Sequence, residues 1–205
     1  DFLIEGGVDG ILVLGSSGEF TGLTKQEKHD FFKFYADYTA GRTKLYAGTG
    51  SLNFEDTVAL SNEVNEMGYE GAMVIGPCYY ALDQEKIFVY YDTLAKSIKG
   101  NLYIYNFPAR SGHSIAPETL KKLVENNTNI KGLKDSVSEP NHTNELMPLY
   151  DMDSNFSLLF KKLMQHRGVE VLDRAIFPYN QMDEEVYKKA ESLMDKVIEE
   201  YQNLK

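Results

Sequence analysis

The sequence predicts an α/β fold built around a parallel sheet, either an open doubly wound sheet or a closed (β/α) barrel. Short apolar strands alternate five times along the chain with longer segments of helical periodicity. The strands are short and largely apolar, which is typical of strands buried on both faces of a parallel sheet. Helix-capping residues and glycine stops separate them, so each strand–helix unit has a defined beginning and end.

Each predicted strand is followed by a turn rich in glycine, serine or proline. In chain order the strands are Ile11–Leu14, Leu45–Ala47, Ala72–Ile75, Leu102–Tyr105 and Ile130–Leu133. The helices between them begin at capping residues and end at glycine or asparagine stops. In chain order they run from Thr24 to Gly41, from Asn53 to Gly68, from Asp83 to Gly100 and from Pro117 to Asn127. Thr24 and Glu27 have the spacing of a capping box, which defines the start of the first helix.

Composition excludes several classes of function. A net charge of −10 and a pI near 4.9 argue against nucleic acid or an anionic membrane surface as the partner. No apolar run approaches the ~18–20 residues of a transmembrane helix, and no signal-peptide pattern opens the chain. The single cysteine, Cys78, excludes an internal disulfide framework and suits a reducing cytoplasm. We expect the four histidines to lie at the surface and no metal site to form. They are His29, His113, His142 and His166.

Polar side chains that carry chemistry follow the ends of all five predicted strands. They are Ser16, Ser17 and Glu19, Thr49 and Ser51, Tyr79 and Tyr80, Tyr105 and Arg110, and Lys134. The carboxyl ends of parallel strands meet at one edge of a sheet, where the loops hold the functional residues. The sequence therefore predicts a functional site at that edge.

The stretch Gly132-Leu-Lys-Asp places Lys134 at the end of the predicted strand Ile130–Leu133. A lysine that ends a buried strand carries a charge that its surroundings solvate poorly, which favours the neutral amine. A neutral amine is a nucleophile toward carbonyl carbons. Lys134 is therefore a candidate catalytic lysine, and the alternative is a solvated lysine at the end of a loop.

Three other motifs have both a functional and a structural interpretation. Gly15-Ser-Ser-Gly-Glu supplies hydroxyls and backbone N–H groups that suit a carboxylate or phosphate, or it is an ordinary Gly/Ser turn. Tyr105 is either a proton relay beside a base or an iminium, or a tyrosine packed in the core. Arg110 is either a bidentate clamp for a substrate carboxylate or a surface arginine.

Four of these motifs, by their order and approximate spacing, resemble the dihydrodipicolinate synthase / N-acetylneuraminate lyase family. They are Gly15-Ser-Ser-Gly-Glu-Phe, Gly76-Pro-Cys-Tyr-Tyr, Tyr105-Asn-Phe-Pro-Ala-Arg-Ser-Gly and Gly132-Leu-Lys-Asp. The resemblance covers roughly residues 1–150. It implies a (β/α)₈ TIM barrel and a pyruvate-dependent class I aldolase. The nearest members are dihydrodipicolinate synthase-like enzymes, with 2-keto-3-deoxy sugar acid aldolases close behind.

The resemblance also implies roles for particular residues. Lys134 matches the lysine that forms a Schiff base with pyruvate, and Tyr105 matches the tyrosine that relays protons to and from the bound intermediate. Tyr79 matches a relay tyrosine that family members insert into the neighbouring subunit's site, which implies at least a homodimer.

The same resemblance assigns the substrate contacts. Ser16 belongs to the proton relay, while Ser17 and Gly18 lie where the family binds the pyruvate carboxylate. Arg110 matches the synthase arginine that holds the second substrate's carboxylate.

The implied reaction condenses pyruvate with an aldehyde such as aspartate semialdehyde, without a metal or organic cofactor. A 2-keto-3-deoxygluconate-type aldolase is the alternative within the family. A relative that binds a keto acid without catalysis, or that serves as an assembly subunit, is the alternative from another class. The identity of the aldehyde depends on loop shapes that one sequence does not define.

The resemblance weakens at both ends of the chain. The family's first strand is absent, and residues 1–160 are expected to form the barrel units, with 161–205 as a C-terminal helical segment of the same domain. Asn155–Phe160 is expected as a further strand, while Arg174–Pro178 and a helix from Asp183 resemble the family's closing segment. A barrel of this type needs about 250 residues. Either the protein is natively shortened or the sequence omits segments, and we favour omission because an open barrel would expose sheet edges.

Overall fold

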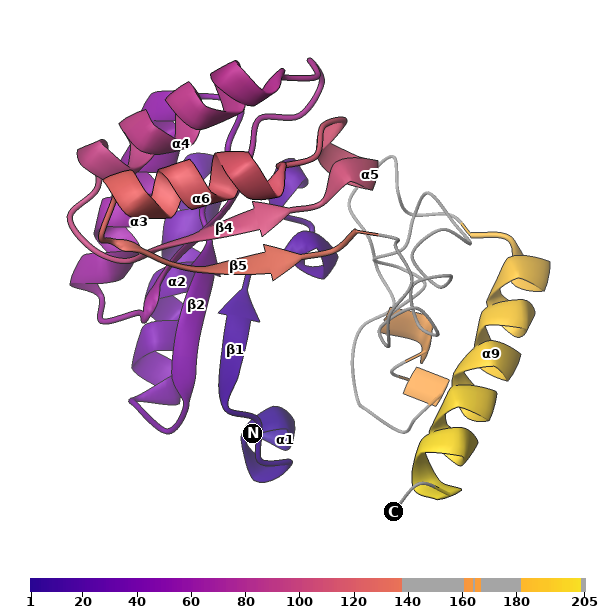
Figure 1. The fold of residues 1–205 in the computed structure, drawn as a ribbon. Helices are drawn as coiled ribbons and strands as arrows, with labels where there is room; N and C mark the ends of the chain where they lie inside the picture. The colour runs from indigo at the N-terminus through magenta and orange to yellow at the C-terminus, as the bar shows by residue number, and fades with distance from the viewer. Residues whose placement is uncertain (138–160, 164, 167–181, 204–205) are drawn as a thin grey trace. The chain divides into compact units, whose positions relative to one another are not determined.

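The computed structural model describes residues 1–137, 161–163, 165–166 and 182–203 (Figure 1). These residues belong to two compact units. The first comprises Asp1–Gly15 and Leu23–Val137, and the second comprises Ser16–Gly22 and Ser138–Lys205. Each unit is described separately below.

The first unit holds a five-stranded parallel sheet, which confirms the five predicted strands and the α/β class. Its strands are β1 (Gly10–Val13), β2 (Lys44–Gly48), β3 (Gly71–Ile75), β4 (Leu102–Asn106) and β5 (Ile130–Asp135). Their order in the sheet is the order in the chain, β1-β2-β3-β4-β5. A doubly wound sheet reverses its strand order at a switch point, whereas a barrel adds strands in sequence. The described strands therefore have barrel topology.

Four helices connect the strands and cover one face of the sheet (Figure 1). They are α2 (Lys25–Thr39), α3 (Phe54–Glu66), α4 (Gln84–Ser97) and α6 (Pro117–Asn126). The predicted caps are confirmed: Thr24 forms a capping box with Glu27, and Asn53 and Asp83 each accept a backbone N–H of the first turn. Shorter segments are α1 (Phe2–Glu5), α5 (Pro108–Ser111) and the 3₁₀ turns η1 (Ser16–Gly18) and η2 (Phe20–Gly22).

The two faces of the sheet differ in burial. The face toward the helices is an apolar core in which Ala47, Ala72, Val74, Leu102 and Ile104 are fully buried. The opposite face carries larger residues, including Tyr46 and Tyr103, whose rings meet edge to face at 5.1 Å. Burial of all strands on both faces was expected and is wrong for β1 and β5, where only Val13 and Ile130 are buried. The reason is that β1 and β5 are the two edge strands of the described sheet, and each has one strand neighbour.

A register shift divides β5 into two parts. Ile130 is paired with Leu102, but Gly132, not Lys131, is paired with the next residue of β4, Tyr103. One extra residue in a strand reverses the faces of all side chains that follow it. Ile130 therefore faces the helices with Leu102, while Lys134, four residues later, faces the opposite side with its register partner Tyr105. In a regular strand, residues four positions apart lie on the same face, so the register shift is what places Lys134 on the face opposite to Ile130.

Strands β1 and β2 approach each other closely at their carboxyl ends. Leu14 has a positive φ of 55°, and its carbonyl oxygen turns toward Gly48. A Cβ atom on Gly48 would lie 2.1 Å from that oxygen, which is far inside van der Waals contact. Only glycine is compatible with this approach, which fixes the path of the chain after β1.

The second unit contains the long helix α9 (Glu184–Asn203), which confirms the helix predicted from Asp183. Leu163 and Ala190 are fully buried in this unit, and they pack with Met182, Tyr187, Leu193 and Met194. The predicted strand Asn155–Phe160 and the segment Arg174–Pro178 lie outside the described residues. The division of one domain at residue 160 stays a prediction. No helix within the described residues has the length and apolar character needed to cross a membrane.

Candidate active site

Lys134 and Tyr105 lie opposite each other at the carboxyl ends of β5 and β4. The Lys134 amine is 3.7 Å from the centroid of the Tyr105 ring, which is cation–π distance. Tyr105 is buried, with 7% of its surface exposed, whereas Lys134 is half-buried. The predicted catalytic lysine therefore has a fixed aromatic neighbour and remains partly accessible to a small molecule.

Ser136 supplies the second contact of the lysine amine. The Lys134 Nζ donates a hydrogen bond to Ser136 Oγ at 3.0 Å. The Ser136 backbone N–H in turn donates to the Asn106 carbonyl at 2.8 Å. The amine is thus held between an aromatic face and a hydroxyl that is itself anchored to β4, an arrangement suited to a positioned nucleophile.

Arg110 is connected to this pair through aromatic stacking. Phe107 stacks on Tyr105 with ring centroids 5.6 Å apart and an interplanar angle of 30°. The Arg110 guanidinium carbon lies 5.9 Å from the centroid of the Phe107 ring. Pro108 begins α5 at its first turn and Gly112 ends it with a φ of 78°, so a single turn carries Arg110. Arg110 is thus exposed and separated from Tyr105 by one aromatic ring, that of Phe107.

Tyr79 lies in the loop after β3, and 86% of its surface is exposed. Its φ of 88° is rare for a residue other than glycine, which marks a strained backbone. Its ring meets that of Tyr80 edge to face at 4.9 Å. The structure thus places Tyr79 at the predicted edge of the sheet with its ring presented to solvent.

Ser16, Ser17 and Gly18 form the turn η1, directly after the end of β1. Ser16 is half-buried, and Ser17 and Gly18 are exposed. They belong to the second unit, in which the next residue, Glu19, forms an ion pair with Lys161. The structure thus brings together Lys134, Tyr105 and, through Phe107, Arg110, while the roles of these turn residues stay predictions.

The sequence interpretation missed Asn106 and Ser136. Asn106 enters the sequence analysis only as a member of the motif Tyr105-Asn-Phe-Pro, yet it is 4% exposed and makes polar contacts to both neighbouring segments. A buried asparagine needs hydrogen-bond partners, so its place beside Tyr105 in the sequence was a usable signal. Ser136 carried a weaker signal, that of a hydroxyl two residues after the candidate lysine.

The expectation that all histidines lie at the surface is wrong for His113, which is 9% exposed. Its ring packs against Gly76 in the loop after β3, where an added Cβ would lie 2.9 Å from His113 Nε2. Its Nδ1 is buried without a hydrogen-bond partner among the described residues. His29 is partly exposed and paired with Glu63. Gly112 ends α5 with a φ of 78°, and the chain then turns so that His113 packs against the loop after β3. This turn explains why His113 is buried while His29 is partly exposed.

Burial makes His113 a source of acid sensitivity. It lowers the pKa of His113 from the ordinary 6.5, and the nearby Ser111 backbone opposes this shift only in part. The folded state therefore binds fewer protons than the unfolded state, so stability is retained above about pH 6.5 and falls as the pH decreases below it. We expect His113→Phe and His113→Gln to lose less stability than the wild type between pH 7 and pH 5, measured by urea unfolding. Equal losses in all three proteins would contradict this assignment.

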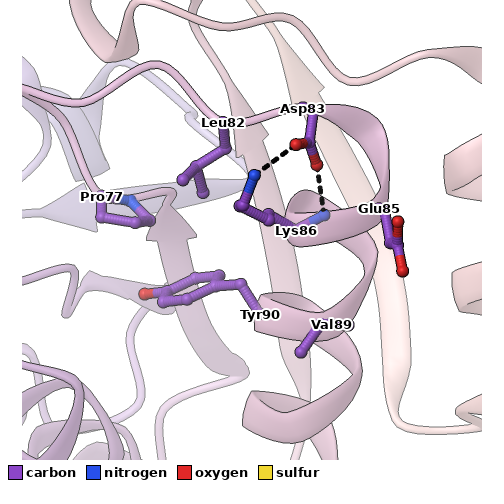
Figure 2. A pocket seen from close by; sticks show the side chains of 7 residues that line it. All are labelled: Pro77, Leu82, Asp83, Glu85, Lys86, Val89 and Tyr90. Carbon is purple, nitrogen blue, oxygen red and sulfur yellow. Dashed lines mark hydrogen bonds and ion pairs between the residues drawn. The ribbon is translucent and has the colours of Figure 1, made fainter.

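A pocket of about 520 Å³ lies apart from the lysine, beside the start of α4 (Figure 2). It is lined by Pro77, Leu82, Asp83, Glu85, Lys86, Val89 and Tyr90. Two of its polar side chains, Asp83 and Lys86, form an ion pair with each other. Burial raises the pKa of Tyr90 to about 12, so this phenol stays protonated near neutral pH. None of the predicted site residues lines this pocket.

The described residues contain no group of three or more His, Cys, Asp or Glu side chains that could hold a metal ion. The sequential parallel sheet, with a lysine and a tyrosine at the carboxyl ends of neighbouring strands, defines an α/β protein of the (β/α)-barrel class. The chain belongs to the dihydrodipicolinate synthetase family, whose model matches residues 1–159.

The curated relatives include aldolases of 2-dehydro-3-deoxy sugar acids and 4-hydroxy-tetrahydrodipicolinate synthases. The chain is 33% identical over 147 residues to the putative 2-dehydro-3-deoxy-D-gluconate aldolase YagE of Escherichia coli K12, covering 72% of this chain and 49% of that protein. It is 34% identical over 148 residues to the 4-hydroxy-tetrahydrodipicolinate synthase of Kosmotoga olearia, covering 72% of this chain and 50% of that protein. The chain thus spans about half the length of these curated relatives.

Solved structures support the fold. The crystal structure of YagE from E. coli K12 in complex with pyruvate superposes with a TM-score of 0.84 at 23% identity, covering 96% of this chain and 89% of that one. The 2-keto-3-deoxygluconate aldolase from Picrophilus torridus gives a TM-score of 0.61 at 32% identity, covering 74% of this chain and 54% of that one. The predicted TIM-barrel class is confirmed.

Proposed function

We propose that this protein is a pyruvate-dependent class I aldolase that forms a Schiff base through Lys134. The observation that carries the proposal is the Lys134 amine held against the Tyr105 ring at the carboxyl ends of two neighbouring parallel strands. Membership of the dihydrodipicolinate synthetase family supports the reaction class. One relative is named as a putative 2-dehydro-3-deoxy-D-gluconate aldolase and another as a 4-hydroxy-tetrahydrodipicolinate synthase, which agrees with the proposed class.

In the proposed reaction, the neutral Lys134 amine attacks the ketone carbon of pyruvate, and loss of water gives an iminium. The iminium withdraws electrons, so a proton leaves the methyl group and an enamine forms. The enamine carbon then adds to an aldehyde, and hydrolysis of the resulting iminium releases the product and the free amine. Retro-aldol cleavage follows the same steps in reverse.

Other predicted residues have roles in this proposal. Tyr105 relays protons to and from the lysine adduct, which agrees with its contact to the amine. Ser16 takes part in that relay, while Ser17 and Gly18 bind the pyruvate carboxylate. Arg110 binds the carboxylate of the second substrate, and its position beyond Phe107 supports this role. The proposed chemistry requires no metal or organic cofactor.

Borohydride trapping tests the proposal directly. Borohydride reduces an imine to a stable secondary amine, so incubation with pyruvate should add a covalent mass that peptide mapping assigns to Lys134. Incubation without pyruvate is the matched control. No adduct at saturating pyruvate would reject the aldolase in favour of a non-catalytic relative that binds a keto acid or supports an assembly.

The proposal leaves two alternatives for the substrate other than pyruvate. Arg110 favours an aldehyde that carries a carboxylate, such as aspartate semialdehyde, and hence a dihydrodipicolinate synthase-like enzyme. The similarity to YagE and to the Picrophilus enzyme favours cleavage of a 2-keto-3-deoxy sugar acid such as 2-keto-3-deoxygluconate. Comparing the specificity constants for these two substrates decides between the branches.

We also propose that the protein forms a homo-oligomer and acts in the cytoplasm. The support for the oligomer is Tyr79, whose exposed ring on a strained backbone matches a tyrosine that reaches a neighbouring subunit in the family. The support for the cytoplasm is the single free cysteine, Cys78.

A further inference from the structure

Asn106 connects three segments of the proposed site through hydrogen bonds. Its Oδ1 accepts the Ile115 backbone N–H at 3.1 Å, beyond the turn that carries Arg110. Its Nδ2 donates to Asp135 Oδ1 at 3.0 Å, next to Lys134 on β5. Its carbonyl oxygen accepts the Ser136 N–H at 2.8 Å. One buried residue thus links the end of β4 to the segments on either side.

These contacts continue to the lysine amine. Ser136, anchored to the Asn106 carbonyl, accepts the hydrogen bond from Lys134 Nζ. Asp135, held by the Asn106 amide, is the residue directly after Lys134 in β5. The position of Lys134 along β5 is therefore tied to Asn106 at two consecutive residues.

The contacts of Asn106 require both a donor and an acceptor in one side chain. The backbone N–H of Ile115 can only donate, and the Asp135 carboxylate accepts, so the orientation of the amide is determined. Aspartate at position 106 would keep the acceptor but place a second carboxylate against Asp135. Alanine would leave the Ile115 N–H without its partner.

We propose that Asn106 is a positioning residue that holds the Lys134 amine and the Arg110 turn in a fixed relation to each other. This proposal rests on the proposed function, because it assigns the reason for that fixed relation to Schiff-base chemistry. A bridging amide that is 4% exposed has little freedom to move, so the amine and the turn stay aligned before substrate arrives.

The test compares three variants of the full chain. Asn106→Asp places two carboxylates face to face. The double variant Asn106→Asp/Asp135→Asn restores one amide and one carboxylate with the donor on the other strand. Asn129→Asp is the matched control, since Asn129 Nδ2 donates to the Ala95 and Gly100 carbonyls at the amino end of β5, away from the lysine. Two quantities are measured below the unfolding temperature of every variant: the rate of borohydride-trapped adduct formation with pyruvate, and the exchange rate of the Ile115 amide by NMR.

We expect Asn106→Asp to slow adduct formation by about 10- to 100-fold, as misplaced reacting groups do. We also expect it to speed Ile115 exchange, because repulsion between the two carboxylates displaces the new acceptor from the Ile115 N–H. The double variant should recover most of both losses, and Asn129→Asp should change neither. The proposal is overturned if Asn106→Asp reacts at the wild-type rate, if the double variant recovers nothing, or if Asn129→Asp slows the reaction equally.

Failure of the proposed function gives a different result. If the wild type forms no adduct at saturating pyruvate, the aldolase is rejected. Ile115 exchange then still decides whether Asn106 holds the Arg110 turn: accelerated exchange in Asn106→Asp, recovered in the double variant, supports that link, and unchanged exchange overturns it.

Discussion

We expect replacement of Lys134 by alanine to abolish the borohydride-trapped pyruvate adduct and to lower turnover by at least about 1,000-fold. The reason is that alanine removes the amine that lies against the Tyr105 ring, which is the proposed nucleophile. No hydroxyl or thiol can replace it, because an imine requires a nitrogen nucleophile. Intact-mass spectrometry after trapping measures the adduct, and a steady-state assay with pyruvate and the preferred aldehyde measures turnover.

Two further substitutions separate chemistry from structure. Lys134→Arg keeps a cation over the Tyr105 ring but forms no stable imine, so it should lose the adduct and retain most of the folding stability. Lys131→Ala removes an exposed lysine from the same strand and should leave the adduct unchanged. A Lys134→Ala protein that still formed an adduct at another lysine would reject the assignment of the nucleophile.

Replacing Gly48 by alanine should lower the free energy of unfolding by about 3 kcal/mol or more, a loss in the range of severe overpacking. The new Cβ would lie 2.1 Å from the Leu14 carbonyl oxygen and 2.8 Å from its carbonyl carbon. These are backbone atoms, so no side-chain rotation relieves the conflict. Urea unfolding at neutral pH, with the slope and the midpoint both fitted, measures the loss.

Gly41→Ala is the matched control for Gly48→Ala. Gly41 has a φ of 76°, but a Cβ there would meet no atom within 4 Å. Its replacement adds backbone strain without a steric conflict and should cost only about 1 kcal/mol. Similar losses of unfolding free energy for the two variants would contradict the close approach of the Leu14 carbonyl to Gly48.

Local signals were sufficient to predict the order of strands and helices. The capping residues Thr24, Asn53 and Asp83 begin helices where they were expected to, because their side chains satisfy N–H groups of the first turn. The short apolar stretches marked all five strands, because strands of a parallel sheet need apolar side chains where they are buried. What they could not show was which of two parallel architectures the strands form, since that depends on strand order in space.

The site was predicted in part. Strand-end position identified Lys134 and Tyr105, which the structure brings into contact. Asn106, Ser136 and His113 were not identified, because their importance comes from contacts between segments distant in sequence. His113 shows this most clearly: nothing near it in the chain reveals that its ring packs against Gly76.

The extra residue in β5 has a consequence for recognising active members of such a family by sequence. The Gly-Leu-Lys-Asp signature alone does not place the amine beside the reacting groups. The face of the sheet on which the lysine lies is set by its spacing from Ile130 together with the register shift between them. A homologue that kept the four-residue spacing from the isoleucine to the lysine but formed a regular β5 would direct the same lysine into the apolar layer beneath the helices. One that lacked both the shift and one residue before Gly132 would keep the lysine on the side of Tyr105. The spacing back to the buried isoleucine position, taken together with the presence or absence of the shift, thus separates catalytic copies from inactive ones.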